Sequence, residues 1–211
     1  MTNQLEENLA LVLSDCQLLD HPFYRRWEAG ELRRDEITKY AEQYRYFESM
    51  FPTFLRELSA QLPEGPIRDS VLDNLSDEIT PPSHLTLFEK FAMWFDASDA
   101  PISPAMSWLV DSYSELLTRG PGASLAGLWA YESQGANIAH FKAEGLARHY
   151  GATAGALEFW MAHGLVEEDH AKWTFDALSL LEPDINDVVP SARLIGQAWW
   201  SFLNEREALA A

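Results

Sequence analysis

The chain has 211 residues, 47% of them hydrophobic, which is enough to bury the core of one domain spanning residues 1–211. It carries 15 basic and 33 acidic side chains, and the resulting net charge of −18 argues against nucleic acid or an anionic membrane as a partner. The single cysteine, Cys16, excludes an intramolecular disulfide framework and a cysteine-rich zinc site.

Apolar residues recur at helical spacing along nearly the whole chain, and no segment alternates like a strand. The first helix is expected at residues 5–19 and stops before His21-Pro22, after which the segment 23–36 turns at Gly30. Asp35 is a candidate N-cap for the next helix. Later helices are expected at residues 67–79, 84–95, 105–118, 124–149, 154–181 and 188–208. The pattern predicts an all-α bundle of seven to eight helices.

Two terminal features bear on location and assembly. The first 15 residues are acidic where a secretory signal would be basic, and no apolar run approaches the roughly 20 residues of a membrane span, so we expect a cytoplasmic protein. Trp199, Trp200 and Phe202 in the last helix are expected to be exposed, which favours a homodimer.

The most informative motif is His163-Gly-Leu-Val-Glu167-Glu-Asp-His170. Steps of four and seven residues on a helix leave side chains about 40° and −20° from the first, so His163, Glu167 and His170 share one stripe. Two imidazoles and a carboxylate that converge in this way are suitable ligands for a first-row metal, and iron in particular.

Two further segments offer ligands of the same kind. Glu132 lies among apolar residues of a helix, where a carboxylate needs a cation, hydrogen bonds or a proton. Glu78 closes one expected helix and His84 opens the next, so both side chains can reach one site. Three carboxylates and three imidazoles would suit two metal ions inside a bundle.

At these residues the chain resembles the heme-oxygenase-like diiron oxidases, the superfamily that includes the TenA thiaminases and pyrroloquinoline quinone synthase. The resemblance rests on HPFYRRWEAGEL from His21, DNLSDE followed by His84, YESQ around Glu132, and the closing motif from His163 to His170. It is strongest to the chlamydial death-domain-associating, para-aminobenzoate synthase type.

The resemblance implies a heme-oxygenase-like fold, two iron ions (or iron with manganese), and oxidation of a small molecule by O2 with an external electron donor. An amino-acid-derived molecule is a candidate substrate. It implies six metal ligands: Glu78, His84, Glu132, His163, Glu167 and His170. The family usually has Asp at the position of Glu167. Glu48 is a candidate seventh ligand, because some relatives have an extra carboxylate there.

In the para-aminobenzoate synthases a tyrosine near the N-terminus is consumed as the precursor, with a lysine as candidate nitrogen donor, and the matching residues are Tyr24 and Lys142. Lys142 is ten residues beyond Glu132, about 15 Å along an ideal helix and −80° off its stripe, which favours a surface position.

Three alternatives stay open from the sequence. A metal-free TenA-like aminopyrimidine hydrolase would need a nucleophilic cysteine, and Cys16 lies ahead of the expected region. A cofactorless oxidase would leave the ligand set without a use. A non-catalytic interaction protein would use the same polar side chains for buried hydrogen bonds.

Overall fold

The computed structural model describes the backbone of residues 2–209 and the side chains of residues 4–166 and 169–209. This part of the chain contains no strand and nine α-helices: α1 (Thr2–Leu13), α2 (Pro22–Ala29), α3 (Arg34–Gln61), α4 (Pro66–Ile79), α5 (His84–Trp94), α6 (Pro104–Arg119), α7 (Pro121–His149), α8 (Ala154–Leu181) and α9 (Ile185–Ala208). The predicted all-α architecture is confirmed. The predicted count of seven to eight helices is wrong, because α2 is an additional helix.

Helix α2 forms because its two ends are capped by residues that the sequence interpretation took only as breaks. Pro22 occupies the first turn, where a missing N–H costs nothing, and His21 Nδ1 accepts a hydrogen bond from the Phe23 amide at 3.1 Å. Gly30 ends the helix in the left-handed conformation, with φ of 71°. The first helix is correspondingly shorter than expected and is followed by two 3-10 turns, Ser14–Cys16 and Leu18–Asp20.

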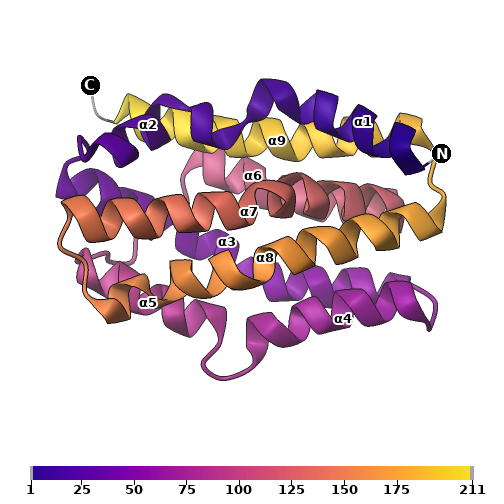
Figure 1. The fold of residues 1–211 in the computed structure, drawn as a ribbon, viewed down its shortest axis with the longest axis horizontal. Coiled ribbons are helices and arrows are strands. Elements are labelled where there is room, and N and C mark those ends of the chain that lie inside the picture. The colour runs from indigo at the N-terminus through magenta and orange to yellow at the C-terminus, as the bar shows by residue number, and fades with distance from the viewer. Residues whose placement is uncertain (1, 210–211) are drawn as a thin grey trace.

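Helix α7 is the centre of the bundle. It packs most extensively against α8 and then α9, which lie on either side of it in Figure 1. Every residue from Ala123 to Glu132 is buried, so all faces of this stretch meet other helices. A Cβ on Gly127 would lie 2.2 Å from Leu116 Cδ1, so the glycine allows α6 to approach closely.

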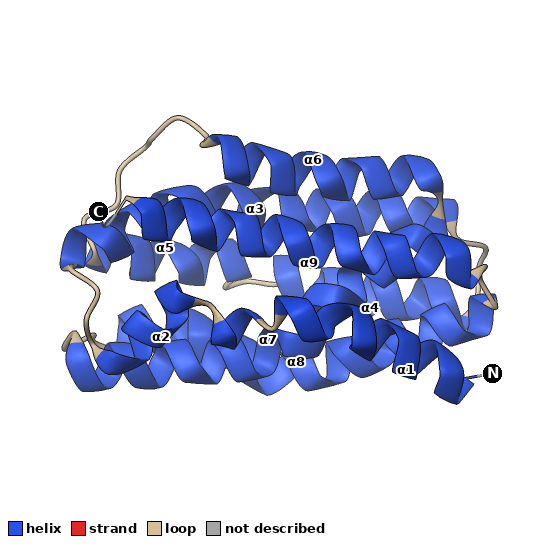
Figure 2. Cartoon of the chain, turned by 90° about the horizontal axis from the view of Figure 1, so that it is seen from above, coloured by secondary structure: helices blue, strands red, loops and turns tan. Residues whose placement is uncertain are grey.

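Helices α4 and α5 lie next to α8 on the side of the bundle away from α9 (Figure 1). Residues 80–83 connect them, and Ser83 caps α5 by accepting a hydrogen bond from the Thr86 amide. Figure 2 shows the helices from above, with residues 95–103 forming the long connection to α6. The end of α4, the start of α5 and the middle of α8 are therefore neighbours.

The aromatic residues of α9 do not form the exposed surface that the sequence favoured. Trp199 and Phe202 are fully buried, and only Trp200 is partly exposed. Tyr131 stacks on Trp199 with ring centroids 4.5 Å apart. The expected basis for a homodimer is wrong, since these rings pack inside the bundle.

Within residues 2–209, no helix is both long enough and apolar enough to cross a membrane.

Candidate metal centre

Three predicted ligands from three helices meet in the interior. Glu78 at the end of α4, His84 at the start of α5 and His163 of α8 each offer a ligand atom within 4.8 Å of the others. Glu78 Oε1 is 2.9 Å from His84 Nδ1, and the rings of His84 and His163 have centroids 4.2 Å apart. All three residues are buried.

Several buried polar atoms at this site have no hydrogen-bond partner in the described part of the chain. Neither oxygen of Glu78 and neither His84 Nδ1 nor His170 Nδ1 has a hydrogen-bond partner among the described residues, although each is buried. The short distance between Glu78 and His84 lacks the angles of a hydrogen bond. Unpaired buried donors and acceptors are costly, and a cation placed between them would compensate for that cost. The side chains therefore fit a metal site.

Glu132 and His170 extend the cluster along α7 and α8. The charge of His170 lowers the pKa of Glu132, and the charge of Glu78 raises it. Both residues therefore lie close enough to Glu132 for their charges to act on it. Glu132 Oε1 accepts a hydrogen bond from Asn74 Nδ2 and Oε2 accepts one from Thr174 Oγ1, each at 2.6 Å. The sixth predicted ligand, Glu167, is in α8, but its side chain lies outside the described residues.

Burial sets the protonation of the candidate ligands. Desolvation lowers the pKa of His163 well below its usual range, and the nearby charges of His84, His170 and Lys142 lower it further. Desolvation raises the pKa of Glu132 to about 7, against the opposing effects of His170 and its two hydrogen-bond donors. A neutral imidazole and a carboxyl group ready to lose its proton are the forms that bind a metal ion.

Lys142 is fully buried, so the surface position favoured by helical geometry is wrong. Its Nζ donates a hydrogen bond to Tyr40 Oη at 2.6 Å and lies 4.1 Å from the centroid of the Trp160 ring. The rings of Tyr24, Tyr40 and Tyr44 are each about as near, with centroids at 5.0, 5.0 and 4.9 Å. Helix α7 has exposed residues near Lys142, such as His140 and Glu144, but the Lys142 side chain points into the core, so its angle from Glu132 does not determine its exposure.

Tyr24 and Lys142, the residues matched to the consumed tyrosine and the candidate nitrogen donor, therefore lie close together. The hydroxyl groups of Tyr24 and Tyr40 are 3.2 Å apart, which links Tyr24 through Tyr40 to Lys142. Burial lowers the pKa of Lys142 well below that of an ordinary lysine, with the charge of Glu48 opposing the change. Burial also raises the pKa of the Tyr24 hydroxyl, which the hydrogen bond with Tyr40 partly offsets. Burial thus favours the neutral form of both groups.

Buried Glu48 interacts electrostatically with both Lys142 and Glu78. Desolvation raises its pKa well above the usual range, the charge of Glu78 raises it further, and Lys142 and a hydrogen bond from Tyr44 oppose the rise. Tyr44 Oη is also 2.5 Å from Tyr131 Oη, next to Glu132. The candidate seventh ligand is therefore an electrostatic neighbour of Glu78.

Cys16 is buried at the edge of α9, in contact with the Gly196 region. Burial raises the pKa of its thiol, whereas a nucleophilic cysteine needs a lowered one. This placement gives no support to a TenA-like hydrolase.

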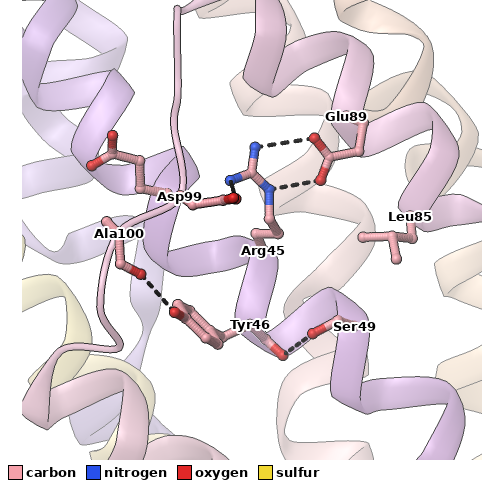
Figure 3. Close-up of a pocket in the computed structure, with 8 residues that line it drawn as sticks. Arg45, Tyr46, Ser49, Leu85, Glu89, Asp99 and Ala100 are labelled. Atoms are coloured by element: carbon pink, nitrogen blue, oxygen red, sulfur yellow. Dashed lines mark hydrogen bonds and ion pairs between the residues drawn. The ribbon is translucent and has the colours of Figure 1, made fainter.

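A surface pocket of about 240 Å³ lies outside this region, between α3, α5 and residues 99–100. Figure 3 shows Arg45 in it, held by both oxygens of Glu89 at 2.6 and 3.0 Å. Ser49 and Leu85 line the pocket, while their neighbours Glu48 and His84 are buried. The pocket is on the outer wall of the two helices and contains none of the candidate ligands.

Three polar side chains at the site had no role in the sequence interpretation. They are Asn74 and Thr174, which bind Glu132, and Asp77, whose Oδ2 is 3.0 Å from His170 Nε2. Asp77 and Asn74 belong to the quoted DNLSDE motif, but an acidic residue near a helix end is common, and only the position of α8 distinguishes Asp77.

A family model described as "Iron-containing redox enzyme" matches residues 38–200, a range that includes all six predicted ligands. The chain belongs to this family. It is 31% identical to the 4-aminobenzoate synthase of Nitrosomonas europaea, over 96% of this chain and 91% of that protein. The resemblance stated from the motifs is thereby confirmed.

Solved structures show the fold. A TenA homologue from Pseudomonas syringae matches with a TM-score of 0.81 at 11% identity, over 98% of this chain and 92% of that one. Heme oxygenase-1 from Synechocystis matches with a TM-score of 0.70 at 16% identity, over 99% and 92%. The fold is therefore heme-oxygenase-like, as the resemblance implied.

Proposed function

We propose that this chain makes 4-aminobenzoate from its own Tyr24, with the nitrogen of Lys142, in a reaction that consumes O2. In this proposal Glu78, His84, Glu132, His163, Glu167 and His170 hold two iron ions, or iron with manganese. The support comes from the family, from the relative in Nitrosomonas europaea and from the unpaired buried ligand atoms. When bound, the metal pair would supply the electrons that reduce O2, and an external donor would restore them.

The observation that carries the proposal is the enclosure of Tyr24 with Lys142. Lys142 Nζ is 5.0 Å from the centroid of the Tyr24 ring, and Tyr40 is hydrogen-bonded to both residues. Among the described residues, no carboxylate lies within ion-pair distance of the amine. A buried lysine without an ion-pair partner is destabilising, and a role in the reaction would explain why Lys142 is there.

The structure of the product dictates which bonds change. The ring carbon that bears the Tyr24 hydroxyl must exchange that oxygen for Nζ, and the Cε–Nζ bond of Lys142 must break. The Cα–Cβ bond of Tyr24 must also break, and O2 must oxidise Cβ to a carboxylate. A neutral amine has the lone pair that such an attack on an oxidised ring requires, and burial favours the neutral form of Lys142. Tyr40 orients the amine, and the surrounding rings exclude water, which would compete with it.

Isotope labelling tests this proposal directly. Chain produced with ring-labelled tyrosine, and separately with ε-nitrogen-labelled lysine, is loaded with Fe(II) without oxygen and then exposed to O2 and a chemical reductant. We expect both labels in 4-aminobenzoate detected by mass spectrometry, and a matching loss of mass from the chain. Unlabelled product would contradict the self-consuming route and would indicate a diffusible substrate instead.

Matched variants provide the controls. Tyr24→Phe and Lys142→Arg should release no product. Tyr46→Phe and Lys39→Arg should behave as wild type, because Tyr46 bonds to the Ala100 carbonyl and Lys39 is on the outer face of α3. A chain that binds no iron would refute the proposed centre.

A further inference from the structure

His170 is held from one side only. Its Nε2 is 3.0 Å from Asp77 Oδ2 in α4, and its Nδ1 is buried without a hydrogen-bond partner among the described residues. A carboxylate accepts hydrogen bonds and does not donate them, so Nε2 bears the proton when His170 is neutral. The lone pair of the imidazole is then on Nδ1, the nitrogen without a hydrogen-bond partner among the described residues.

This arrangement is the one that metal-binding histidines adopt. A ligating imidazole usually donates its second N–H to a carboxylate or carbonyl, which fixes the tautomer and the direction of the ring. Asp77 is adjacent in sequence to Glu78, so one turn of α4 would provide both a ligand and the support of another. His170 is fully buried, whereas the Asp77 side chain is 44% exposed, so the pair closes the outer side of the site.

The same helices support Glu132. Asn74 precedes Glu78 by four residues and donates to Glu132 Oε1, while Thr174 follows His170 by four residues and donates to Oε2. Residues four apart on a helix lie on the same face. Each supporting group is therefore one helical turn, or one residue, from a proposed ligand, and together they tie α4, α7 and α8 to one another.

We propose that Asp77 is a positioning residue of the metal centre, which holds His170 with Nδ1 directed at the ion, and that Asn74 and Thr174 hold Glu132 in the same way. This inference rests on the proposed function. Asp77, Asn74 and Thr174 do not contact the metal. They fix the orientation of the ligands His170 and Glu132 in the metal-free protein.

The test uses two measurements on the full chain, neither of which needs catalysis. Nitrogen NMR of histidine-labelled, metal-free chain at neutral pH reports the tautomer of His170, with its signals assigned by their loss in His170→Gln. Titration of Fe(II) without oxygen, and of Co(II) followed by its visible absorption, reports the affinity and number of bound ions.

We expect wild-type His170 to carry its proton on Nε2, and Asp77→Ala to give a mixture of tautomers and an affinity about tenfold to a hundredfold lower at one ion. Asp77→Asn keeps an acceptor oxygen and should recover most of the affinity. Asp73→Ala, one turn away on the exposed face of α4, should match wild type. Thr174→Val, which keeps the shape of the side chain, should weaken binding through Glu132 and leave the His170 tautomer unchanged.

An unchanged tautomer or an unchanged affinity in Asp77→Ala would overturn the inference, with circular dichroism verifying that the variant is folded. A wild-type chain that takes up no metal would instead overturn the proposed centre. The nitrogen chemical shifts are measured on the metal-free chain, so they test whether Asp77 orients His170 even if the chain takes up no metal.

Discussion

The amine of Lys142 and the hydroxyl of Tyr40 form a hydrogen bond of 2.6 Å in a part of the core where neither residue is exposed. Tyr40 also shares a hydrogen bond with Tyr24, so it is the connection between the two proposed reactants. The geometry of the reaction therefore depends on a residue that is not itself consumed.

Tyr40→Phe tests that dependence. The ring and its packing remain, but Lys142 loses its hydrogen-bond acceptor and Tyr24 loses its partner. We expect the yield of 4-aminobenzoate per chain to fall at least tenfold, because the amine is no longer directed, while the melting temperature changes little. Tyr46→Phe is the control for removing a hydroxyl from the same helix, and equal yields from the two variants would contradict the role of Tyr40.

Lys142→Met should separate stability from function. The change removes a buried amine that lacks an ion-pair partner and keeps most of the volume, so we expect the free energy of unfolding to rise by about 1–3 kcal/mol. Product formation should cease. Urea denaturation of both proteins measures the difference, and a destabilised variant would show that Lys142 contributes to the fold instead.

The pH dependence of stability should differ between these two proteins. The pKa of Lys142 is lowered in the folded chain, so the unfolded chain binds more protons between that lowered value and the ordinary lysine pKa of about 10.4. The penalty for burying Lys142 is therefore fully present at lower pH and disappears as the pH rises through this range. The stability advantage of Lys142→Met should shrink over the same range, and an advantage that is constant with pH would refute the lowered pKa.

Gly145→Ala tests how α2 is held against α7. A Cβ at this position would lie 2.7 Å from Trp27 Cδ1 and 3.3 Å from the Trp27 carbonyl oxygen, so α2 must shift. The Trp27 indole also donates to the Lys142 carbonyl at 3.4 Å, and the shift would move Tyr24 away from Lys142.

We expect Gly145→Ala to cost about 1–3 kcal/mol of stability, as measured by urea denaturation, and to reduce product yield. Gly155→Ala is the matched control, since nothing lies within 4 Å of its added Cβ, and it should stabilise α8 by about 0.5–1 kcal/mol. Equal stability of the two variants would show that Trp27 moves away from the added Cβ at little cost in free energy.

Iron should stabilise the chain if the cluster of Glu78, His84 and His163 binds it. Ligands that bind only the folded state raise the melting temperature with concentration. We expect anaerobic Fe(II) to raise the melting temperature of wild type, to do so less in His163→Ala, and to act normally on His149→Ala, whose exposed side chain lies against Gly30 at the end of α7. Equal responses of all three proteins would exclude His163 as a ligand.

The helical periodicity and the ligand types were sufficient to predict the fold class and the three residues, Glu78, His84 and His163, that the structure brings together. The stripe formed by His163 and His170 follows from helical geometry alone. Glu78 and His84 meet because the connection between α4 and α5 is short, which the sequence also shows.

Other features depend on packing between helices. Lys142 was expected at the surface because its angle on α7 differs from that of Glu132, but α7 is exposed at His140 and Glu144 and still buries Lys142, so that angle alone does not determine exposure. Trp199 is likewise buried by packing against other helices, which its position in the sequence alone does not reveal. Asp77 contacts His170 only because α8 packs against α4, and no local sequence pattern predicts that contact.

The enclosure of Lys142 by aromatic rings also selects what can reach the amine. A small apolar gas such as O2 can pass through brief openings between packed side chains, whereas a hydrated ion or a soluble reductant is too large and too polar to follow.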